Sequence, residues 1–289
     1  MTKKKSGFVA IIGRPNVGKS TLMNTILGKK IAIVSHVPQT TRNTIRGIYT
    51  KEDAQIVFLD TPGIHESAKM FNKILSSQAL TSIGEADMIL YMVDVTRPFG
   101  QEEEIIVDML LKAKKPVILA YNKVDVKGSK VAENSIFLRE KFKDFPAVTE
   151  HFISALKNSY VDELLETILD KLTEGEFYYP EGMYTDMAID FQVSELIRES
   201  ILHLSYEEVP HATKVEVKHI DDDSLKLISI YADILVEREG QKGIMVGKGA
   251  SKLKEIGIQS RQKLEDLFNK KVFLKLQVKV DENWRAKMY

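Results

Sequence analysis

The chain has 289 residues, of which 44% are hydrophobic and 28% are charged, and its 41 basic residues balance 41 acidic ones. This composition is typical of a soluble globular protein with room for two domains, and zero net charge argues against a polyanion-binding protein taken as a whole. The absence of cysteine excludes disulfides and thiolate metal sites. No apolar run approaches the roughly 18 residues of a membrane span, and the short N-terminus leaves no room for a secretory signal, so we expect a cytoplasmic protein.

The first candidate site is a loop between an apolar run, residues 8–12, and a helical pattern that begins near Lys19. The loop and the first helical residues are Gly13, Arg14, Pro15, Asn16, Val17, Gly18, Lys19, Ser20 and Thr21. This is the G-x-x-x-x-G-K-[ST] pattern in the context of strand, loop and helix. Glycines let backbone N–H groups approach an anion, Lys19 reaches the β- and γ-phosphates, and Ser20 offers a hydroxyl to Mg²⁺. The pattern predicts a nucleoside-triphosphate site.

A long polar loop, residues 38–44, comes next, and loops of this kind are often functional. Two strands follow, and the second ends in Asp60, Thr61, Pro62 and Gly63. We expect Asp60 to hold Mg²⁺ through water and the Gly63 N–H to contact the γ-phosphate. Thr41 would ligate Mg²⁺ only when the γ-phosphate is present, which makes the loop an order–disorder switch. Thr40 is an adjacent alternative for this role.

Strands and helices alternate over the rest of the first half. Buried-strand runs occur at 87–93, 116–121 and 148–153, and helical patterns occur at 67–83, 101–113, 132–142 and 160–172. This alternation predicts a doubly wound α/β domain with a mostly parallel sheet. Ligands of such sheets bind beyond the carboxyl ends of the strands, and every polar motif of this half lies at such an end.

Two of these strand ends predict recognition of guanine. Asn122, Lys123, Val124 and Asp125 follow one buried strand. The Asp125 carboxylate can accept hydrogen bonds from the N1–H and the 2-amino group of guanine, which adenine does not offer, so GTP is favoured over ATP. Asn122 would tie this loop to the phosphate loop, and the Lys123 stem would lie against the base. The segment of Ser154, Ala155 and Leu156 would supply backbone N–H groups to the guanine O6.

The residue that orients the hydrolytic water is harder to find. Ras-type enzymes place a glutamine shortly after the switch glycine, but here Ile64 cannot orient water and His65 is more simply a solvated loop residue. Asn16 could offer its carbonyl to K⁺ beside the phosphates, and that cation would neutralise charge as an arginine finger does. The alternative is that Asn16 only closes the loop. The catalytic candidates are therefore Asn16, Lys19, Thr41 and Gly63.

The second half has a different pattern. We expect the first domain to span 1–174, a linker to span 175–186 and the second domain to span 187–289. Its elements are a helix at 192–204, strands at 214–218 and 225–236, helices at 251–256 and 260–268, and a strand at 272–280. Residues 240–289 hold 12 Lys or Arg against 5 Asp or Glu, a local charge of +7. A basic unit on a neutral chain suggests a binding domain attached to a domain of different function.

A glycine turn opens the first helix of that basic region, with the residues Gly247, Lys248, Gly249 and Ala250. Such a turn can clamp a nucleic-acid backbone, as the G-x-x-G turn of KH domains does, and the order α-β-β-α-α-β is that of a type II KH domain. Lys248, Lys252 and Lys254 are the expected phosphate contacts. Ala250 departs from the pattern, because alanine is disfavoured at positive φ.

Taken together, the chain resembles the Era family of bacterial GTPases over nearly its whole length. The resemblance rests on GRPNVGKST, QTTRN, DTPG, NKVD, SAL, FYYPEGMYTD and MVGKGASKLKEIG. It implies a Ras-like domain followed by a KH domain, hydrolysis of GTP to GDP with Mg²⁺, and binding to the 3′ end of small-subunit ribosomal RNA during 30S maturation. It also implies domains that rearrange with nucleotide state and a peripheral association with the inner face of the cell membrane; we expect a monomer. The family's lack of a switch glutamine matches Ile64, whereas Ala250 and Leu156, where Lys is common, are departures.

Two other functions remain open at this point. A GTPase acting on transfer RNA would share the Asn-bearing loop and the TTR segment, but the basic C-terminal unit counts against that architecture. A GTP-binding scaffold with little turnover is kept open by Ile64.

Overall fold

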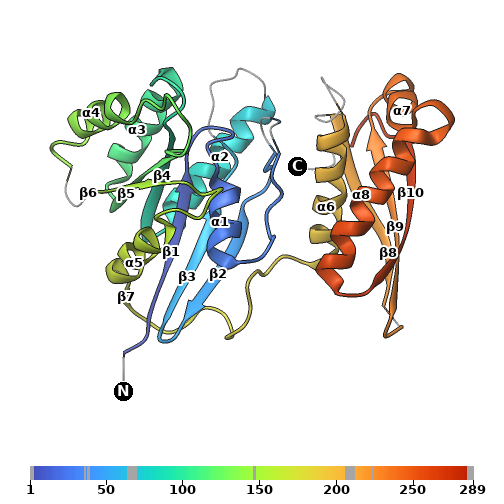
Figure 1. The fold of residues 1–289 in the computed structure, drawn as a ribbon, viewed down its shortest axis with the longest axis horizontal. Helices are drawn as coiled ribbons and strands as arrows, with labels where there is room; N and C mark the ends of the chain where they lie inside the picture. Colours follow the sequence, from blue (N-terminus) through green and yellow to red (C-terminus); the bar gives the residue numbers. More distant parts are fainter. Residues whose placement is uncertain are drawn as a thin grey trace. The chain divides into compact units, whose positions relative to one another are not determined.

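The computed structural model describes residues 3–35, 37, 40–63, 70–145, 148–205, 212–222 and 224–284, without the side chains of 70–76. The chain divides into two compact units, Met1–Asp186 and Met187–Tyr289 (Figure 1). In the part that is described, no helix is both long and apolar enough to cross a membrane.

The first unit alternates strands and helices from its N-terminus. Its elements are β1 (Lys5–Ile12), α1 (Lys19–Leu27), β2 (Ile45–Lys51), β3 (Ala54–Asp60), α2 (Met70–Glu85), β4 (Met88–Asp94), α3 (Gln101–Ala113), β5 (Val117–Asn122), α4 (Val131–Lys141), β6 (Val148–Ile153), α5 (Val161–Lys171) and β7 (Thr173–Glu174). The strand order is β2-β3-β1-β4-β5-β6, with β7 beside β1. The pairs from β3 to β6 are parallel, and β2 and β7 pair antiparallel with β3 and β1.

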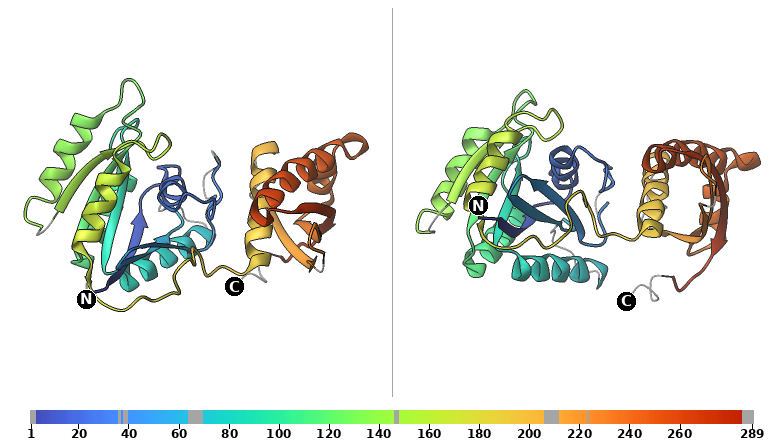
Figure 2. Two further views of the ribbon diagram at one scale, coloured as in Figure 1. Left: turned by 60° about the horizontal axis from the view of Figure 1, so that its bottom comes forward. Right: turned by 90° about the horizontal axis from the view of Figure 1, so that it is seen from below.

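Helices cover both faces of this sheet (Figure 2). On one face, α2, α3 and α4 enclose a core that includes Ile83, Ile106 and Leu138, and α1 and α5 lie on the other face. Because both faces are covered, β3 and β4 are buried along their whole length, as the unbroken apolar runs of a parallel sheet require. The predicted doubly wound α/β fold is confirmed.

Residues 175–186 are held against β2 and β3 of the first unit rather than standing free. The buried Gln55 side chain donates to the Tyr179 carbonyl at 2.9 Å and accepts from the Tyr179 N–H at 3.0 Å. Further along, the Ile48 N–H donates to the Tyr184 carbonyl at 3.0 Å. The Arg46 guanidinium pairs with Asp186 at 3.0 Å. The expected linker therefore forms an extended strap along the first unit.

The second unit has three helices on one face of a three-stranded sheet, among the residues described (Figure 1). Its elements are α6 (Ile189–Leu204), β8 (Thr213–Asp221), β9 (Leu227–Val236), α7 (Glu239–Val246), the 3₁₀ turn η2 (Lys248–Ala250), α8 (Ser251–Phe268) and β10 (Lys271–Val280). In the order β10-β9-β8, β9 is parallel to β10 and antiparallel to β8. Its core includes Val193, Ile197, Ile230, Ile256 and Leu264. The α-β-β-α-α-β order expected of a KH domain is confirmed.

The identity of the two central helices was predicted wrongly. The expected helices at 251–256 and 260–268 are one helix, α8. Glycine inside a helix costs about 1 kcal/mol relative to alanine, and Gly257 lies between the two expected segments. However, Ile256, Ser260 and Leu264 are buried at helical spacing on both sides of that glycine, and their burial holds the helix together.

The first of the central helices is α7, which the sequence did not predict. Its two glycines, Gly240 and Gly243, lower its intrinsic helix propensity. Tertiary and capping contacts compensate: Met245 is fully buried, and the Gln241 side chain accepts hydrogen bonds from the N–H groups of Glu237 and Arg238 at 2.9 and 3.1 Å.

Candidate functional site

A cavity of about 450 Å³ opens at the carboxyl edge of the parallel sheet of the first unit. Most of the residues that the sequence singled out line it: Pro15, Asn16, Gly18, Lys19, Ser20, Thr21, Thr40, Thr41, Gly63, Asn122, Lys123, Asp125, Ser154, Ala155 and Leu156. They come from loops that are far apart in the chain. They meet because parallel strands place their carboxyl ends at one edge of the sheet.

The phosphate loop is packed so closely that two glycines are required for steric reasons. A Cβ on Gly18, whose φ is 108°, would lie 2.3 Å from the Asn122 side-chain nitrogen. A Cβ on Gly63 would lie 2.5 Å from the backbone nitrogen of Pro15. The loop after β3 therefore touches the phosphate loop through bare backbone. Asn16 also has a positive φ, 62°, which asparagine tolerates better than most residues.

Lys19 lies across this loop with its side chain almost fully buried. Its ammonium donates to the carbonyls of Gly13 and Arg14 at 3.1 and 3.0 Å. Burial lowers the pKa of Lys19 to about 8, and the nearby Asp60 carboxylate opposes that shift. Burial likewise raises the pKa of Asp60 to about 6, against the attraction of Lys19 and a hydrogen bond from Ser20. Both groups thus lie in a desolvated setting. There, the attraction of Lys19 for a bound anion and of Asp60 for a bound cation is stronger than it would be in water.

Three oxygen-bearing side chains converge beside Lys19. The Ser20 hydroxyl donates to Asp60 Oδ2 at 2.6 Å and lies 3.2 Å from the Thr41 hydroxyl. Asp60 Oδ1 is buried without a hydrogen-bond partner among the described residues. Hydroxyl and carboxylate oxygens are ligands that Mg²⁺ prefers, so this set fits a magnesium ion. The Thr40 hydroxyl donates back to the Val37 carbonyl at 2.6 Å, which favours Thr41 over Thr40 for the metal.

Asn122 ties three loops together at the other end of the cavity. Its side-chain nitrogen donates to the Val17 carbonyl at 2.7 Å, and its oxygen accepts from the Ala155 N–H at 2.9 Å. The Lys123 ammonium donates to the Asn16 carbonyl at 2.8 Å. Hydrogen bonds therefore hold the phosphate loop and the two predicted base-binding loops in fixed positions relative to one another.

Asp125 stands at the mouth of the cavity. A hydrogen bond from the Ser154 side chain holds the pKa of Asp125 below its usual range, and Lys157, 3.3 Å away, acts in the same direction. The carboxylate is consequently ionised and able to accept two hydrogen bonds at neutral pH. Leu156 lines the cavity but is 81% exposed, so most of its side chain faces solvent.

The structure assigns Arg14 a different place from the one expected. Its guanidinium turns toward α3, where it pairs with Glu102 and lies 2.6 Å from the buried Glu103. Only the Arg14 backbone faces Lys19. The remaining predicted residues do not line the cavity but are buried behind its wall: Gly13, Val17, Asp60, Thr61 and Pro62. Ile64 and His65 lie outside the described residues.

Sequence reasoning missed Asp94 and Arg97. The Asp94 carboxylate accepts from Lys123 at 2.6 Å, and Arg97 lines the cavity. Burial raises the pKa of Asp94, but the hydrogen bonds from Lys123 and Thr96 outweigh it and hold that pKa below its usual value. Asp94 is the last residue of β4 and Arg97 lies in the loop that follows, so the rule that ligands bind beyond strand ends could have found them. Four further lining residues carry no such signal: Ile33, Val34, Ser35 and Val126.

The second unit has its own candidate site at the glycine turn. Gly247, Gly249 and Ala250 have φ values of 73°, 58° and 61°, so three of the four residues have positive φ, and Gly249 and Ala250 are in the left-handed helical conformation. A Cβ on Gly247 would lie 2.9 Å from the Cβ of Lys252. A cleft of about 490 Å³ begins at Ala250 and runs between α8 and β10. It is lined by Ala250, Leu253, Lys254, Gly257, Ile258, Arg261, Val272, Phe273, Leu274 and Leu276.

Comparison with known proteins identifies a family for each of the two units. Residues 8–123 match the family described as 50S ribosome-binding GTPase, and residues 208–285 match the KH domain family. The GTPase Era of Carboxydothermus hydrogenoformans is 45% identical over 284 residues, covering 98% of this chain and 95% of that protein. The GTPase Era of Staphylococcus haemolyticus is 45% identical over 288 residues, covering 100% of this chain and 96% of that protein.

Two solved structures are similar over nearly the whole chain. A point variant of Aquifex aeolicus Era bound to GDP·AlF4⁻ is 40% identical, with a TM-score of 0.90 and coverage of 98% of this chain and 96% of that chain. Era in complex with MgGDPNP and nucleotides 1506–1542 of 16S ribosomal RNA is 39% identical, with the same TM-score and coverage. On these grounds, and with a guanine-nucleotide cavity and a KH cleft in one polypeptide, the chain belongs to the Era family of GTPases.

Proposed function

We propose that this GTPase binds the 3′ end of small-subunit ribosomal RNA through its second unit and assists maturation of the 30S subunit. The observation that carries the RNA part is the cleft of about 490 Å³ that starts at the left-handed turn of Gly247 to Ala250. A relative that is 39% identical over 98% of this chain was solved with nucleotides 1506–1542 of 16S ribosomal RNA. That likeness supports the choice of RNA.

In the first unit, the chain's own groups provide positioning and charge for GTP hydrolysis. Lys19 would exchange its two backbone carbonyl partners for the β- and γ-phosphates, and the Gly63 N–H would contact the γ-phosphate. Ser20, Thr41 and Asp60 would hold Mg²⁺, which when bound neutralises charge between the β- and γ-phosphates. Asp125 would accept hydrogen bonds from guanine while Ser154 and Ala155 face its O6.

Asn16 is the proposed contributor to charge neutralisation by K⁺. It lines the cavity beside Lys19 and Gly18, and its backbone is anchored by the Lys123 hydrogen bond at 2.8 Å. A rigid backbone lets the Asn16 side chain present its carbonyl at a defined point near the phosphates. A monovalent cation held there would act where other GTPases place an arginine.

In the second unit, a single RNA strand would lie along the cleft with its backbone on the turn. Lys248 and Lys254 are exposed beside the turn, and Lys252 is next to it, so all three can reach phosphates. Gly249 leaves open space, in which an added Cβ would meet nothing within 4 Å. The bases would face the apolar wall, to which the half-exposed Ile258 belongs.

The proposed role places the protein in the cytoplasm, where ribosomal subunits mature. A peripheral fraction at the inner face of the cell membrane, implied by the family resemblance, and a monomeric state are part of the same proposal. Cell fractionation and light scattering of the purified chain test them. Cells depleted of the chain should accumulate unfinished 30S subunits, and the Lys19→Ala variant should not restore maturation.

The direct test is Gly247→Asp, measured by titration with a fluorescent RNA of the 16S 3′ end. The new side chain would meet Lys252 and add a negative charge at the turn, so RNA binding should be lost while GTP binding is kept. Gly240→Asp is the matched control, because it adds the same charge on α7, where an added Cβ meets nothing within 4 Å. Unchanged RNA affinity of Gly247→Asp would reject the cleft as the RNA site.

Two further variants test the same contacts without a substitution at a glycine of the turn. Lys248→Gln and Lys254→Gln change exposed side chains, and each should lower the log–log salt slope of RNA binding by about 0.7. A salt slope equal to that of the unaltered protein would count against phosphate contacts at the turn.

A further inference from the structure

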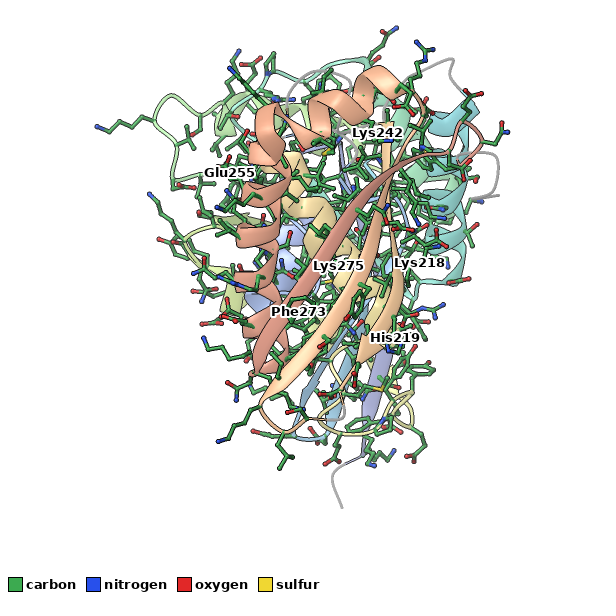
Figure 3. All side chains as sticks on the ribbon, turned by 90° about the vertical axis from the view of Figure 1, so that its right-hand side faces the viewer. Lys218, His219, Lys242, Glu255, Phe273 and Lys275 are labelled. Atoms are coloured by element: carbon green, nitrogen blue, oxygen red, sulfur yellow. The ribbon has the colours of Figure 1, made fainter. Side chains whose placement is uncertain are left out.

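The sheet of the second unit carries a row of aromatic rings on the face opposite its helices. His219 lies on β8, Tyr231 on β9 and Phe273 on β10, and the ring centroids of Tyr231 lie 6.2 Å from those of both neighbours. Figure 3 shows His219 and Phe273 on the outer strands of this sheet, together with Lys218 and Lys275. We call His219, Tyr231 and Phe273 the aromatic row.

These rings are not part of the core. Tyr231 is 37% exposed and Phe273 is 50% exposed, whereas the alternate residues of the same strands, such as Ile230 and Val272, are buried against the helices. The open face of a sheet that is covered on one side normally carries polar residues. A row of half-exposed rings on this face therefore indicates a binding surface, one suited to a ligand with flat apolar faces.

The charge beside the aromatic row is positive along β10. This strand places Lys271, Lys275 and Lys279 on the open face and contains no Asp or Glu. The Lys275 ammonium lies 6.0 Å from the centroid of the Tyr231 ring. On the neighbouring strands, the carboxylate of Asp233 is paired with Lys279 at 2.7 Å and with Lys218 at 3.8 Å. Glu216 is paired with Lys218 at 2.9 Å and Glu265 with Lys271 at 3.6 Å. A polyanion would therefore meet Lys275 beside the aromatic row.

The aromatic row is continuous with the cleft. Phe273 lines the cleft between α8 and β10 and also stands in the row, because β10 is the edge strand of the sheet. A strand of RNA that leaves the cleft across β10 would pass Phe273 and then reach Tyr231. RNA fits both the rings and the lysines of this face, since it supplies flat bases for the rings and phosphates for the lysines.

We propose that the open face of this sheet is a second RNA contact, on which bases of the single strand outside the cleft stack on Phe273 and Tyr231 while Lys275 contacts phosphate. The proposal rests on the proposed function of the cleft and extends it: the cleft would hold about four nucleotides, as KH domains do, and the aromatic row would hold nucleotides beyond them. The row thus lengthens the RNA segment that the chain recognises.

The test compares two RNA lengths on the full chain. One RNA covers the cleft only, with about four nucleotides, and the others extend it by about four nucleotides at the 5′ or the 3′ end. One extended RNA should bind the unaltered chain at least about fivefold more tightly than the short RNA, which corresponds to the lower end of one base–aromatic stack. Tyr231→Leu should remove this gain without changing affinity for the short RNA, whereas Tyr231→Phe, which keeps the ring, should retain it.

Two further variants make the result specific. Leu225→Ala removes another exposed apolar side chain of the same unit, in the turn between β8 and β9, and should retain the gain. Lys275→Gln alters an exposed charge without removing a ring, and should weaken the extended RNA and lower its salt slope by about 0.7. Ultraviolet crosslinking of the extended RNA, followed by mass spectrometry, should identify Tyr231 or Phe273.

The two proposals fail in different ways. If Tyr231→Leu and Lys275→Gln keep the full gain of the extended RNA, the aromatic row is not an RNA surface and would have to contact a protein instead, while the cleft assignment stands. If Gly247→Asp binds the short RNA as the unaltered chain does, the cleft assignment fails whatever the aromatic row does.

Discussion

Replacing Ala250 with glycine should stabilise the second unit. Ala250 has φ 61° and ψ 21°, and this left-handed conformation costs an L-residue about 1–2 kcal/mol. Glycine removes that cost but gains freedom in the unfolded chain, which subtracts about 0.4–1 kcal/mol. The Ala250 methyl group is exposed, so its removal loses little buried surface. The net expectation is a gain of about 0.5–1 kcal/mol in the free energy of unfolding.

The chain contains a single tryptophan, Trp284, which is 1% exposed and lies in the second unit, so its fluorescence reports unfolding of that unit. For a domain of this size, the expected gain corresponds to a rise of about 2–8 °C in the midpoint of thermal unfolding. Gly249→Ala is the mirror control, because Gly249 has φ 58° and open space around it, so the same conformational term should appear with the opposite sign. RNA affinity of Ala250→Gly should be equal to or higher than that of the unaltered chain.

A lower Trp284 midpoint in Ala250→Gly, or an unchanged midpoint in Gly249→Ala, would contradict this expectation. Either result would mean that the turn does not hold these left-handed conformations in solution. The turn would then have no preformed shape to clamp an RNA backbone.

The remaining predictions concern the nucleotide cavity. Asp125→Asn should weaken GTP binding and strengthen xanthosine triphosphate binding, because the donor and acceptor pattern is inverted; unchanged GTP affinity in a competition titration would reject the assignment. Lys19→Ala should weaken GTP by at least about tenfold, since a charged hydrogen bond at a desolvated phosphate contributes about 1.5–3 kcal/mol, and a titration like that of the unaltered chain would contradict it. Hydrolysis should be faster in K⁺ than in Na⁺, and Asn16→Ala should abolish the difference; equal rates in both salts would leave Asn16 a structural role. Asp94→Asn should weaken GTP severalfold by releasing Lys123, with little change in metal binding measured separately, whereas an unaltered GTP affinity would show that Lys123 holds its place without Asp94.

The sequence by itself determined the class of both sites. The segments from Gly13 to Ser20 and from Asn122 to Asp125 follow strands, and their residue types match the demands of phosphate and guanine chemistry. Parallel strands bring their carboxyl ends to one edge, so local patterns were sufficient to predict that these segments meet. The glycine turn could also be predicted from the sequence, because backbone with positive φ favours glycine and so enriches the turn in glycines.

Only the tertiary structure decided which side chains serve these sites. Arg14 turns to α3 because Glu103 is buried within reach of its guanidinium, and Lys123 is oriented by Asp94 from a neighbouring strand. The helix α7 exists despite its glycines because Met245 is buried by elements distant in the chain. The aromatic row needs three strands in one register before it appears at all. Each of these features depends on contacts between segments that are distant in the chain. The spacing of residues within one segment does not predict which other segment it will contact.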